Sequence, residues 1–216
     1  MKPFLSYIGS KQKFMKNLEP FFPETINNYY EPFVGGGSVL FYLNQTRSIN
    51  KNFINDLDSD VINVYKVIKN NSKKLINYLE KLNKSYTKKD FEILVKVFNE
   101  NKSDKVLLAA IYIYLNKKSF NGNLKYGKDN IAKPYYSEQA KNTNIYNNDN
   151  IEKISKLLNN TLIKKKDYIK FLKEYDIKKG DFVFIDPPYL VENVKSYYKE
   201  TFDFDNFKNL KNEWDK

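Results

Sequence analysis

Short hydrophobic runs alternate along the chain with apolar residues at helical spacing, and this alternation predicts an α/β fold. The clearest run is Phe182–Ile185, in which β-branched and aromatic residues precede an acid and two prolines. Such a run predicts a buried strand that ends in a polar tip. Further strands are predicted ahead of the glycines in Tyr29–Ser38, at Phe53–Asp56 and at Thr161–Lys164.

Helices are predicted between and after these strands. Ser10 is the expected N-cap of an amphipathic helix that places Phe14, Leu18 and Phe21 on one face. Other helices are predicted at Val39–Asn44, Val61–Lys69, Lys73–Leu82, Lys88–Asn99, Asp104–Lys117, Ile151–Leu158, Ile169–Glu174 and Asp205–Trp214. With 216 residues, this order favours one catalytic α/β domain that is interrupted by a mostly helical lobe.

The chain is strongly basic. It has 37 Lys and Arg residues against 26 Asp and Glu residues, a net charge of +11 and a pI near 9.4. A surface of this kind suits a polyanion such as nucleic acid, on whose bases the aromatic residues could stack. An AT-rich genome also enriches Lys and Asn, and many Tyr and Phe residues belong to a core, so both interpretations stay open.

Two residue types are absent, and their absence narrows the chemistry. Without cysteine the chain has no thiolate nucleophile, disulfide framework or thiolate metal site, and without histidine it lacks the commonest general base and metal ligand. Cytosine ring-carbon methyltransferases, zinc deaminases and histidine-based hydrolases are therefore excluded, and no metal is expected. No signal segment or long apolar span is visible, so we expect a soluble protein of the cytoplasm, in a bacterium or in a phage- or virus-infected cell.

The tip of the Phe182–Ile185 strand suits methylation of an exocyclic amine. Asp186 can accept one N–H of such an amine, and the prolines 187 and 188 leave a rigid carbonyl as a second acceptor. Tyr189 offers a flat face for stacking a base. The alternative is that these four residues are only a turn that ends a strand.

The glycine turn at Gly35–Gly37 lies between a strand and a helix, where a ligand can approach the backbone closely. Its spacing is neither G-x-G-x-x-G nor a phosphate loop, which argues against a nicotinamide-dependent oxidoreductase. Asp56 ends the second strand, a position from which an acid can bind ribose hydroxyls. Asp58 and Asp60 follow and can instead cap the next helix.

With these pieces in order, the sequence resembles the Dam-like (D12 class) family of DNA adenine-N6 methyltransferases. The resemblance covers nearly the whole chain and rests on an ordered set of short motifs. These are Tyr7-Ile8-Gly9-Ser10-Lys11, Glu31-Pro32-Phe33-Val34-Gly35-Gly36-Gly37-Ser38, Asn55-Asp56, Tyr114-Leu115-Asn116, Phe120-Asn121-Gly122, Lys133-Pro134-Tyr135-Tyr136 and Asp186-Pro187-Pro188-Tyr189.

The resemblance implies a Rossmann-like sheet that binds S-adenosyl-L-methionine and acts on duplex DNA. Asp186, Pro188 and Tyr189 would grip a flipped adenine, with Asp186 also close to the cofactor. Tyr7 and Lys11 would cover the cofactor, and Asp56 would take its ribose hydroxyls. The remaining cofactor contacts would be Phe33, Val34, Gly35, Gly36, Gly37, Ser38, Asp167 and Tyr168.

The resemblance also divides the chain. Residues 1–70 and 151–216 correspond to the catalytic domain, and 71–150 to a target-recognition lobe with DNA contacts from Phe120, Asn121 and Lys125. Lys125 stands where relatives often carry an arginine that reads guanine, so a GATC target is not implied.

Relatives in the family continue with further strands after the catalytic motif. The implied strand order here is third, second, first, fourth, so we expect a truncated sheet and an exposed fourth strand. A non-catalytic DNA- or cofactor-binding remnant and an RNA adenine methyltransferase therefore stay open as alternatives. The sequence predicts neither the oligomeric state nor whether the role is restriction-linked, phage-encoded or independent.

Overall fold

The computed structural model describes residues 1–188, except 8, 85, 86, 101, 102, 123, 125, 128 and 130, together with Lys208. Apart from Lys208, the predicted helix Asp205–Trp214 therefore lies outside the described residues, as do two predicted site residues, Lys125 and Tyr189. Within this part of the chain, no helix is both long enough and apolar enough to cross a membrane.

The described residues form a parallel sheet in the order β3-β2-β1-β4, which confirms the predicted α/β class and strand order. Its strands are β1 (Asn28–Glu31), β2 (Lys51–Asn55), β3 (Thr161–Lys164) and β4 (Phe182–Val183). Strand β4 is shorter than predicted and only partly buried. The reason is its place at the edge of the described sheet, where it pairs with β1 alone.

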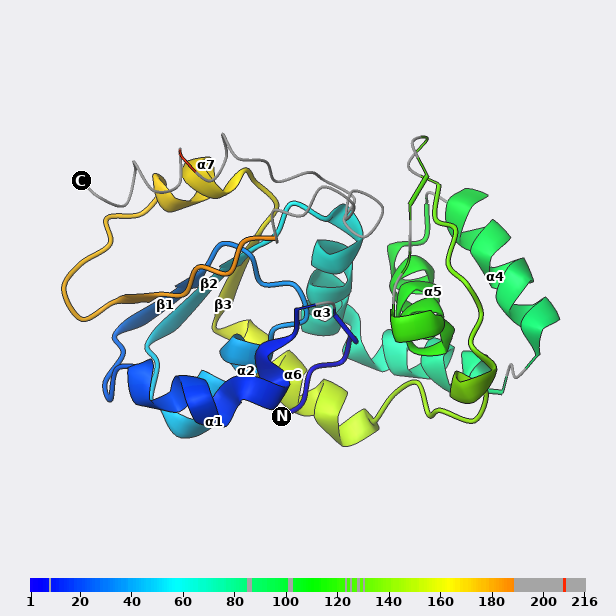
Figure 1. The fold of residues 1–216 in the computed structure, drawn as a ribbon, viewed down its shortest axis with the longest axis horizontal. Helices are drawn as coiled ribbons and strands as arrows, with labels where there is room; N and C mark the ends of the chain where they lie inside the picture. The colour runs from blue at the N-terminus through cyan, green and yellow to red at the C-terminus, as the bar shows by residue number, and fades with distance from the viewer. Residues whose placement is uncertain are drawn as a thin grey trace.

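Side chains of the central strands point alternately to two faces, and helices cover both (Figure 1). On one face Tyr30 stacks on Phe53 at 4.6 Å, and both pack with Phe171 of α7 (Tyr168–Leu172). On the other face Tyr29 and Ile54 join a larger core with α2 (Ser38–Thr46) and α6 (Asn148–Asn159). The sheet is thus the middle layer of a three-layer sandwich.

The segment after Ser10 departs from prediction. Ser10 is the N-cap, as expected, but the helix is broken into η1 (Lys11–Phe14), α1 (Met15–Leu18) and η2 (Glu19–Phe21). The 3₁₀ turns have three residues per turn and Pro20 interrupts the α-helix, so the apolar face rotates. Phe14 and Phe21 are consequently 58% and 80% exposed, and buried residues Met15 and Phe22 take their place.

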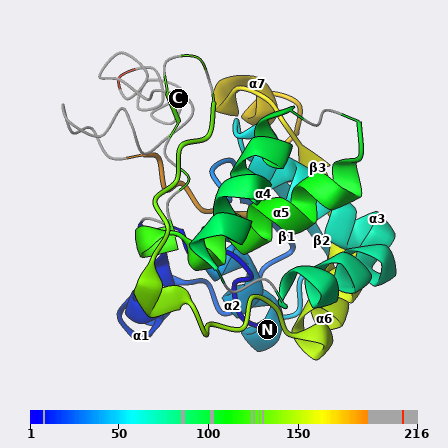
Figure 2. The same ribbon diagram turned by 90° about the vertical axis from the view of Figure 1, so that its right-hand side faces the viewer.

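Helix α3 (Ser59–Leu82) joins the sheet to a second group of helices. It is bent at Asn71, whose φ of −142° is not helical, and this bend separates the two helices that the sequence predicts. Beyond it lie α4 (Lys88–Glu100) and α5 (Lys105–Lys118), with the short turns η3 (Phe120–Gly122) and η4 (Glu138–Ala140). Figure 2 shows α4 and α5 in front of the sheet.

One hydrophobic core extends through both groups of helices. Its buried members run from Leu40 of α2, through Tyr65 and Ile68 of α3, to Phe91 of α4 and Tyr114 of α5. The helices that cover the sheet and the helices near α5 are therefore packed together. The division into a catalytic domain (1–70 and 151–216) and a recognition lobe (71–150) stays a prediction.

Candidate active site

The carboxyl ends of the parallel strands gather acidic side chains at one edge of the sheet. Glu31 ends β1, Asp56 directly follows β2, and Asp186 follows β4. Ligands of open α/β sheets bind at the carboxyl ends of the strands, so this edge is the candidate site. The resemblance implied that Asp56 and Asp186 both lie beside the cofactor, and in the structure both are near enough for their charges to act on Glu31.

The loop that contains residues 7–11 lies across this edge. Its Lys11 ammonium donates to both carboxylate oxygens of Asp186, at 2.7 and 2.6 Å, and to the Gly9 carbonyl at 3.1 Å. The Ser10 and Ser38 hydroxyl oxygens are 2.7 Å apart. Lys11 and Asp186 are 20% and 30% exposed. A partly buried ion pair and one hydroxyl contact therefore join the segment after β4, the loop and the start of α2.

The glycine turn is packed against rings of the protein itself. A Cβ atom on Gly35 would lie 2.8 Å from the Tyr7 ring, and one on Gly36 would lie 3.1 Å from the Tyr7 Cβ. Gly37 has a φ of +73°, and a Cβ there would lie 2.4 Å from the Tyr65 hydroxyl. The sequence predicted that a ligand approaches the backbone at these glycines, and that stays a prediction. In this structure the Tyr7 and Tyr65 side chains lie close to the glycine backbone.

Asp56 fixes the glycine turn by hydrogen bonds. Its Oδ2 accepts from the Gly35 amide and its Oδ1 from the Asp58 amide, each at 2.9 Å. Burial raises the pKa of the Asp56 carboxyl, which these backbone amides oppose. The N-cap of α3 is Asp58, which accepts from the amides of Asp60 and Val61. Asp58 therefore caps the helix, and Asp56 is the acid that lies at the edge of the sheet.

Glu31 is a buried acid to which the sequence analysis gave no role. Its side chain is 3% exposed, and its Oε2 atom has no hydrogen-bond partner among the described residues. Burial raises the pKa of the Glu31 carboxyl well above its usual value, and the charges of Asp186 and Asp56 raise it further. An acid at the end of a run of aromatic strand residues was the signal that could have identified it.

Two of the predicted cofactor contacts, Phe33 and Tyr168, lie side by side. The Phe33 ring and the Tyr168 ring are 5.2 Å apart, so motifs that are far apart in sequence form one aromatic wall. Asp167 is the N-cap of α7 and accepts from the amides of Ile169 and Lys170. The side chain of Asp167 therefore orders this helix start.

The predicted DNA contacts extend from the end of α5. The Phe120 amide donates to the Tyr135 carbonyl at 2.8 Å, and Ser119 pairs with Tyr136 in an antiparallel bridge. The Phe120 and Tyr135 side chains are 59% and 65% exposed. Asn121 has a φ of 55°, which turns the chain sharply after Phe120. Two aromatic rings and an amide are thereby presented on adjacent segments.

Lys118 and Asn116 are buried polar residues of α5. Asn116 belongs to one of the motifs of the resemblance, but the sequence analysis gave neither residue a role. The Lys118 ammonium donates to the carbonyls of Ala140, Lys141 and Thr143, at 3.2, 2.6 and 2.8 Å. It thus holds the segment after η4 against α5. Both residues sit in a helix whose neighbours are mostly apolar, which is the pattern that marks a buried polar position.

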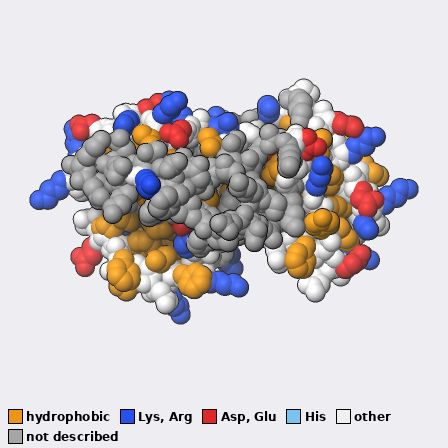
Figure 3. All heavy atoms as spheres, turned by 45° about the horizontal axis from the view of Figure 1, so that its top comes forward, with side chains coloured by type: hydrophobic (Ala, Val, Ile, Leu, Met, Phe, Trp, Pro, Cys, Tyr) orange, Lys and Arg blue, Asp and Glu red, His pale blue; other side chains and the backbone are white. Residues whose placement is uncertain are grey.

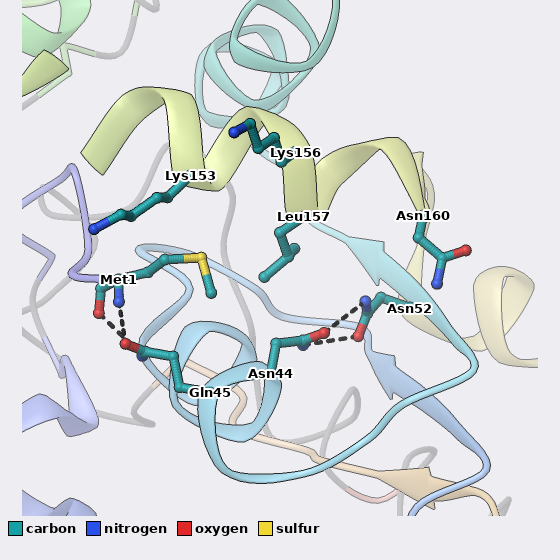
Figure 4. Close-up of a pocket in the computed structure, with 8 residues that line it drawn as sticks. All are labelled: Met1, Asn44, Gln45, Asn52, Lys153, Lys156, Leu157 and Asn160. Carbon is teal, nitrogen blue, oxygen red and sulfur yellow. Dashed lines mark hydrogen bonds between the residues drawn. The ribbon is translucent and has the colours of Figure 1, made fainter. Parts of the chain in front are cut away.

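A separate surface hollow of about 510 Å³ lies near the amino end of β2, away from these residues. Figure 4 shows its lining, which comes mainly from α2 and α6. The Asn44 and Asn52 amides that face it donate to each other at 3.0 and 3.1 Å. No predicted site residue lines it, so the hollow is not part of the candidate site.

A metal centre is not evident in the part of the chain that the structure describes, where no group of acidic residues is arranged to hold an ion. The chemistry of the edge is instead that of carboxylates, one ammonium group and aromatic rings. Such a set of groups can bind a ligand that carries positive and negative charges and a flat ring.

Comparisons with known proteins place the chain in one family. The model of the D12 class N6 adenine-specific DNA methyltransferase family matches residues 7–215. The type II methyltransferase M.MjaIII of Methanocaldococcus jannaschii is 35% identical over 92% of this chain and 72% of its own length. The type II methyltransferase M1.LlaDCHI of Lactococcus lactis subsp. cremoris is 32% identical over 95% of this chain and 73% of its own length. The DNA adenine methylase of Escherichia coli is 29% identical over 63% of this chain and 51% of its own length.

Proposed function

Because the chain belongs to the D12 class N6 adenine-specific DNA methyltransferase family, we propose that it transfers a methyl group from S-adenosyl-L-methionine to N6 of a flipped adenine in duplex DNA. The observation that carries the proposal is the contact of Asp186 with Lys11, on the loop whose Tyr7 packs against the glycine turn. It joins the catalytic motif and the cofactor motif at one edge of the sheet.

The residues at this edge fit the proposed cofactor. S-adenosyl-L-methionine carries a sulfonium and an ammonium cation, a carboxylate, ribose hydroxyls and an adenine ring. The carboxylates of Asp56 and Asp186 match the cations and hydroxyls, and the Lys11 ammonium matches the carboxylate. The wall of Phe33 and Tyr168 can pack on the ring. When bound, the cofactor supplies an electrophilic methyl group.

In the proposed reaction, Asp186 orients the target amine. The Lys11 ammonium contacts both Asp186 oxygens, and each oxygen has a second lone pair that can accept an N–H. The fixed φ of Pro187 and Pro188 limits the motion of the adjoining carbonyls. Tyr189 would stack on the flipped adenine, because the amine cannot reach the methyl group inside a duplex.

DNA binding is proposed for the loops around Phe120. The Phe120 and Asn121 side chains are exposed at the end of α5, and Lys125 follows in the sequence. An exposed aromatic ring can insert between or stack on bases, and an amide can bind base edges. A net charge of +11 favours the approach of this surface to phosphates.

The test is methyl transfer from labelled S-adenosyl-L-methionine to duplex DNA by the unaltered protein and by Asp186→Ala. We expect the substitution to lower the rate by roughly 10²–10⁴-fold, the usual contribution of a side chain that contacts the reacting group. DNA affinity, measured by fluorescence anisotropy, should change little. Asp176→Ala is the matched control, because Asp176 is 84% exposed.

The alternatives give different results in the same assay. DNA binding without methyl transfer by the unaltered protein would identify a non-catalytic binding protein. Faster methylation of RNA adenine than of duplex DNA would move the substrate to RNA. Equal rates for Asp186→Ala and the unaltered protein would contradict the proposed role of Asp186.

A further inference from the structure

The side chain of Asn116 joins two loops that are far apart in the sequence. Asn116 lies in the last turn of α5 and is 3% exposed. Its Oδ1 accepts from the Ser6 amide at 2.8 Å, and its Nδ2 donates to the carbonyls of Ser6 and Gly122, at 2.8 and 2.6 Å. None of these hydrogen bonds is to its own helix, so the side chain does not act as a helix cap.

Each of the two loops contains a residue of the proposed site. Ser6 directly precedes Tyr7, whose ring packs against Gly35 and Gly36. Gly122 ends the turn η3 that begins at the exposed Phe120. The Asn116 amide therefore lies between the segment proposed to cover the cofactor and the segment proposed to contact DNA.

The two loops also touch directly. Gly122 has a φ of +69°, and a Cβ atom there would lie 2.5 Å from the Ser6 Cβ and 3.1 Å from the Ser6 carbonyl oxygen. Only glycine allows this approach without strain. Both backbone polar groups of Ser6 are held by Asn116, so a movement of Ser6 must shift the amide and with it the Gly122 carbonyl.

We infer that Asn116 is a positioning residue that couples cofactor binding to DNA binding. The inference rests on the proposed function, since it uses Tyr7 as the cofactor cover and Phe120 as the DNA contact. A cofactor that fixes Tyr7 also fixes Ser6, and the Asn116 bridge then holds Gly122 and the Phe120 turn in the binding geometry. Less conformational freedom remains to be lost when DNA binds, which makes the two ligands cooperative.

The experiment measures the affinity for DNA with and without saturating S-adenosylhomocysteine, the non-reactive product of the cofactor. The DNA probe is a labelled duplex pool with a randomised centre. For the unaltered protein we expect the cofactor product to tighten DNA binding by roughly 5- to 150-fold, the usual range of coupling between two sites. The reciprocal titration must give the same factor, because linkage is symmetric.

Two substitutions break the bridge from opposite sides. Asn116→Ala removes all three hydrogen bonds, and Gly122→Ala pushes the η3 turn away from Ser6. In both variants the coupling factor should fall toward one. Ser6→Ala is the matched control, because it keeps the backbone atoms that Asn116 contacts and should keep the coupling factor. Thermal unfolding without ligands shows which variants are folded. One folded variant of the pair Asn116→Ala and Gly122→Ala is sufficient to test the inference.

The outcomes separate this inference from the proposed function. An unaltered protein that binds no S-adenosylhomocysteine or no DNA contradicts the proposed function. Binding of both ligands without mutual effect contradicts the coupling alone. A folded Asn116→Ala or Gly122→Ala variant with the full coupling factor also overturns it, as does loss of coupling in Ser6→Ala.

Discussion

At the scale of single residues, the site brings like charges together. Glu31, Asp56 and Asp186 lie at one edge of the sheet, close enough for the charges of Asp56 and Asp186 to act on Glu31. Asp186 forms an ion pair with Lys11. Asp56 is stabilised by backbone amides. Glu31 has one oxygen, Oε2, without a hydrogen-bond partner among the described residues. Burial raises the pKa of its carboxyl well above the usual value, although Tyr29 and the Leu40 backbone oppose that rise, so ionisation of Glu31 is strongly unfavourable.

Replacing Glu31 with Gln should therefore stabilise the free protein at alkaline pH. Burial raises the pKa of the folded Glu31 above the usual value of 4.5, so folding favours the protonated form. The resulting stability is fully present below pH 4.5 and is lost as the pH rises through the raised pKa. Glu31→Gln keeps a neutral side chain at every pH, so its advantage appears only at higher pH.

The measurement is the midpoint of thermal unfolding at pH 8 and near pH 4. We expect Glu31→Gln to unfold at a higher temperature at pH 8, by about 2–4 °C for each kcal/mol gained in a protein of this size. The difference should shrink near pH 4. Glu24→Gln is the control, since Glu24 is exposed. The same difference at both pH values would show that ionisation of Glu31 is not the cause.

At the scale of elements, local patterns predicted most of the fold. Strand β3 has the predicted bounds, and the glycine turn connects a strand to a helix as expected. The pattern failed at residues 11–21, because a mixture of 3₁₀ and α turns does not keep the α-helical period. It also could not show that Tyr7 and Tyr65 fill the space beside the glycines, since that packing joins distant segments.

Gly37 should tolerate a side chain less well than Gly36. Alanine at Gly37 must adopt a φ of +73° and would place its Cβ atom 2.4 Å from the Tyr65 hydroxyl. The left-handed backbone alone costs about 1–2 kcal/mol for a residue with a Cβ. Gly36 has no positive φ, and its Cβ would lie 3.1 Å from the Tyr7 Cβ, a tight contact that small movements of Tyr7 can relieve.

Urea unfolding of Gly37→Ala and Gly36→Ala measures this difference. We expect Gly37→Ala to lose more than about 1 kcal/mol of unfolding free energy, and Gly36→Ala to lose less. Equal losses would mean that the turn relaxes at both positions. In that case the left-handed conformation of Gly37 would not limit the sequence of the turn.

At the scale of the whole molecule, the family resemblance implied the arrangement of the sheet, while the site depends on contacts across the fold. The structure confirms the implied strand order. The Asn116 bridge and the Lys118 contacts arise where α5 meets segments far away in sequence. No local period predicts such contacts, because each needs a partner placed by tertiary packing.

Charge acts at this scale as well. Figure 3 shows Lys and Arg side chains around the visible surface of both halves, interspersed with fewer acidic ones. The net charge of +11 therefore acts as a field over the molecule, which attracts DNA without choosing a sequence. Sequence choice must come from groups such as Phe120 and Asn121 that can reach bases.

DNA affinity should accordingly fall steeply with salt, while Phe120 contributes a term that salt does not change. Each neutralised phosphate adds about −0.9 to the slope of log affinity against log salt concentration, so several contacts give a slope of several units.

The Phe120→Ala substitution removes an exposed ring and no charge. We expect it to lower affinity by the same factor at every salt concentration, about 1–3 kcal/mol for one stacked base, and to leave the slope unchanged. Salt titrations of both proteins measure the two effects. A flatter slope in Phe120→Ala would instead mean that the ring positions neighbouring lysines on the phosphates.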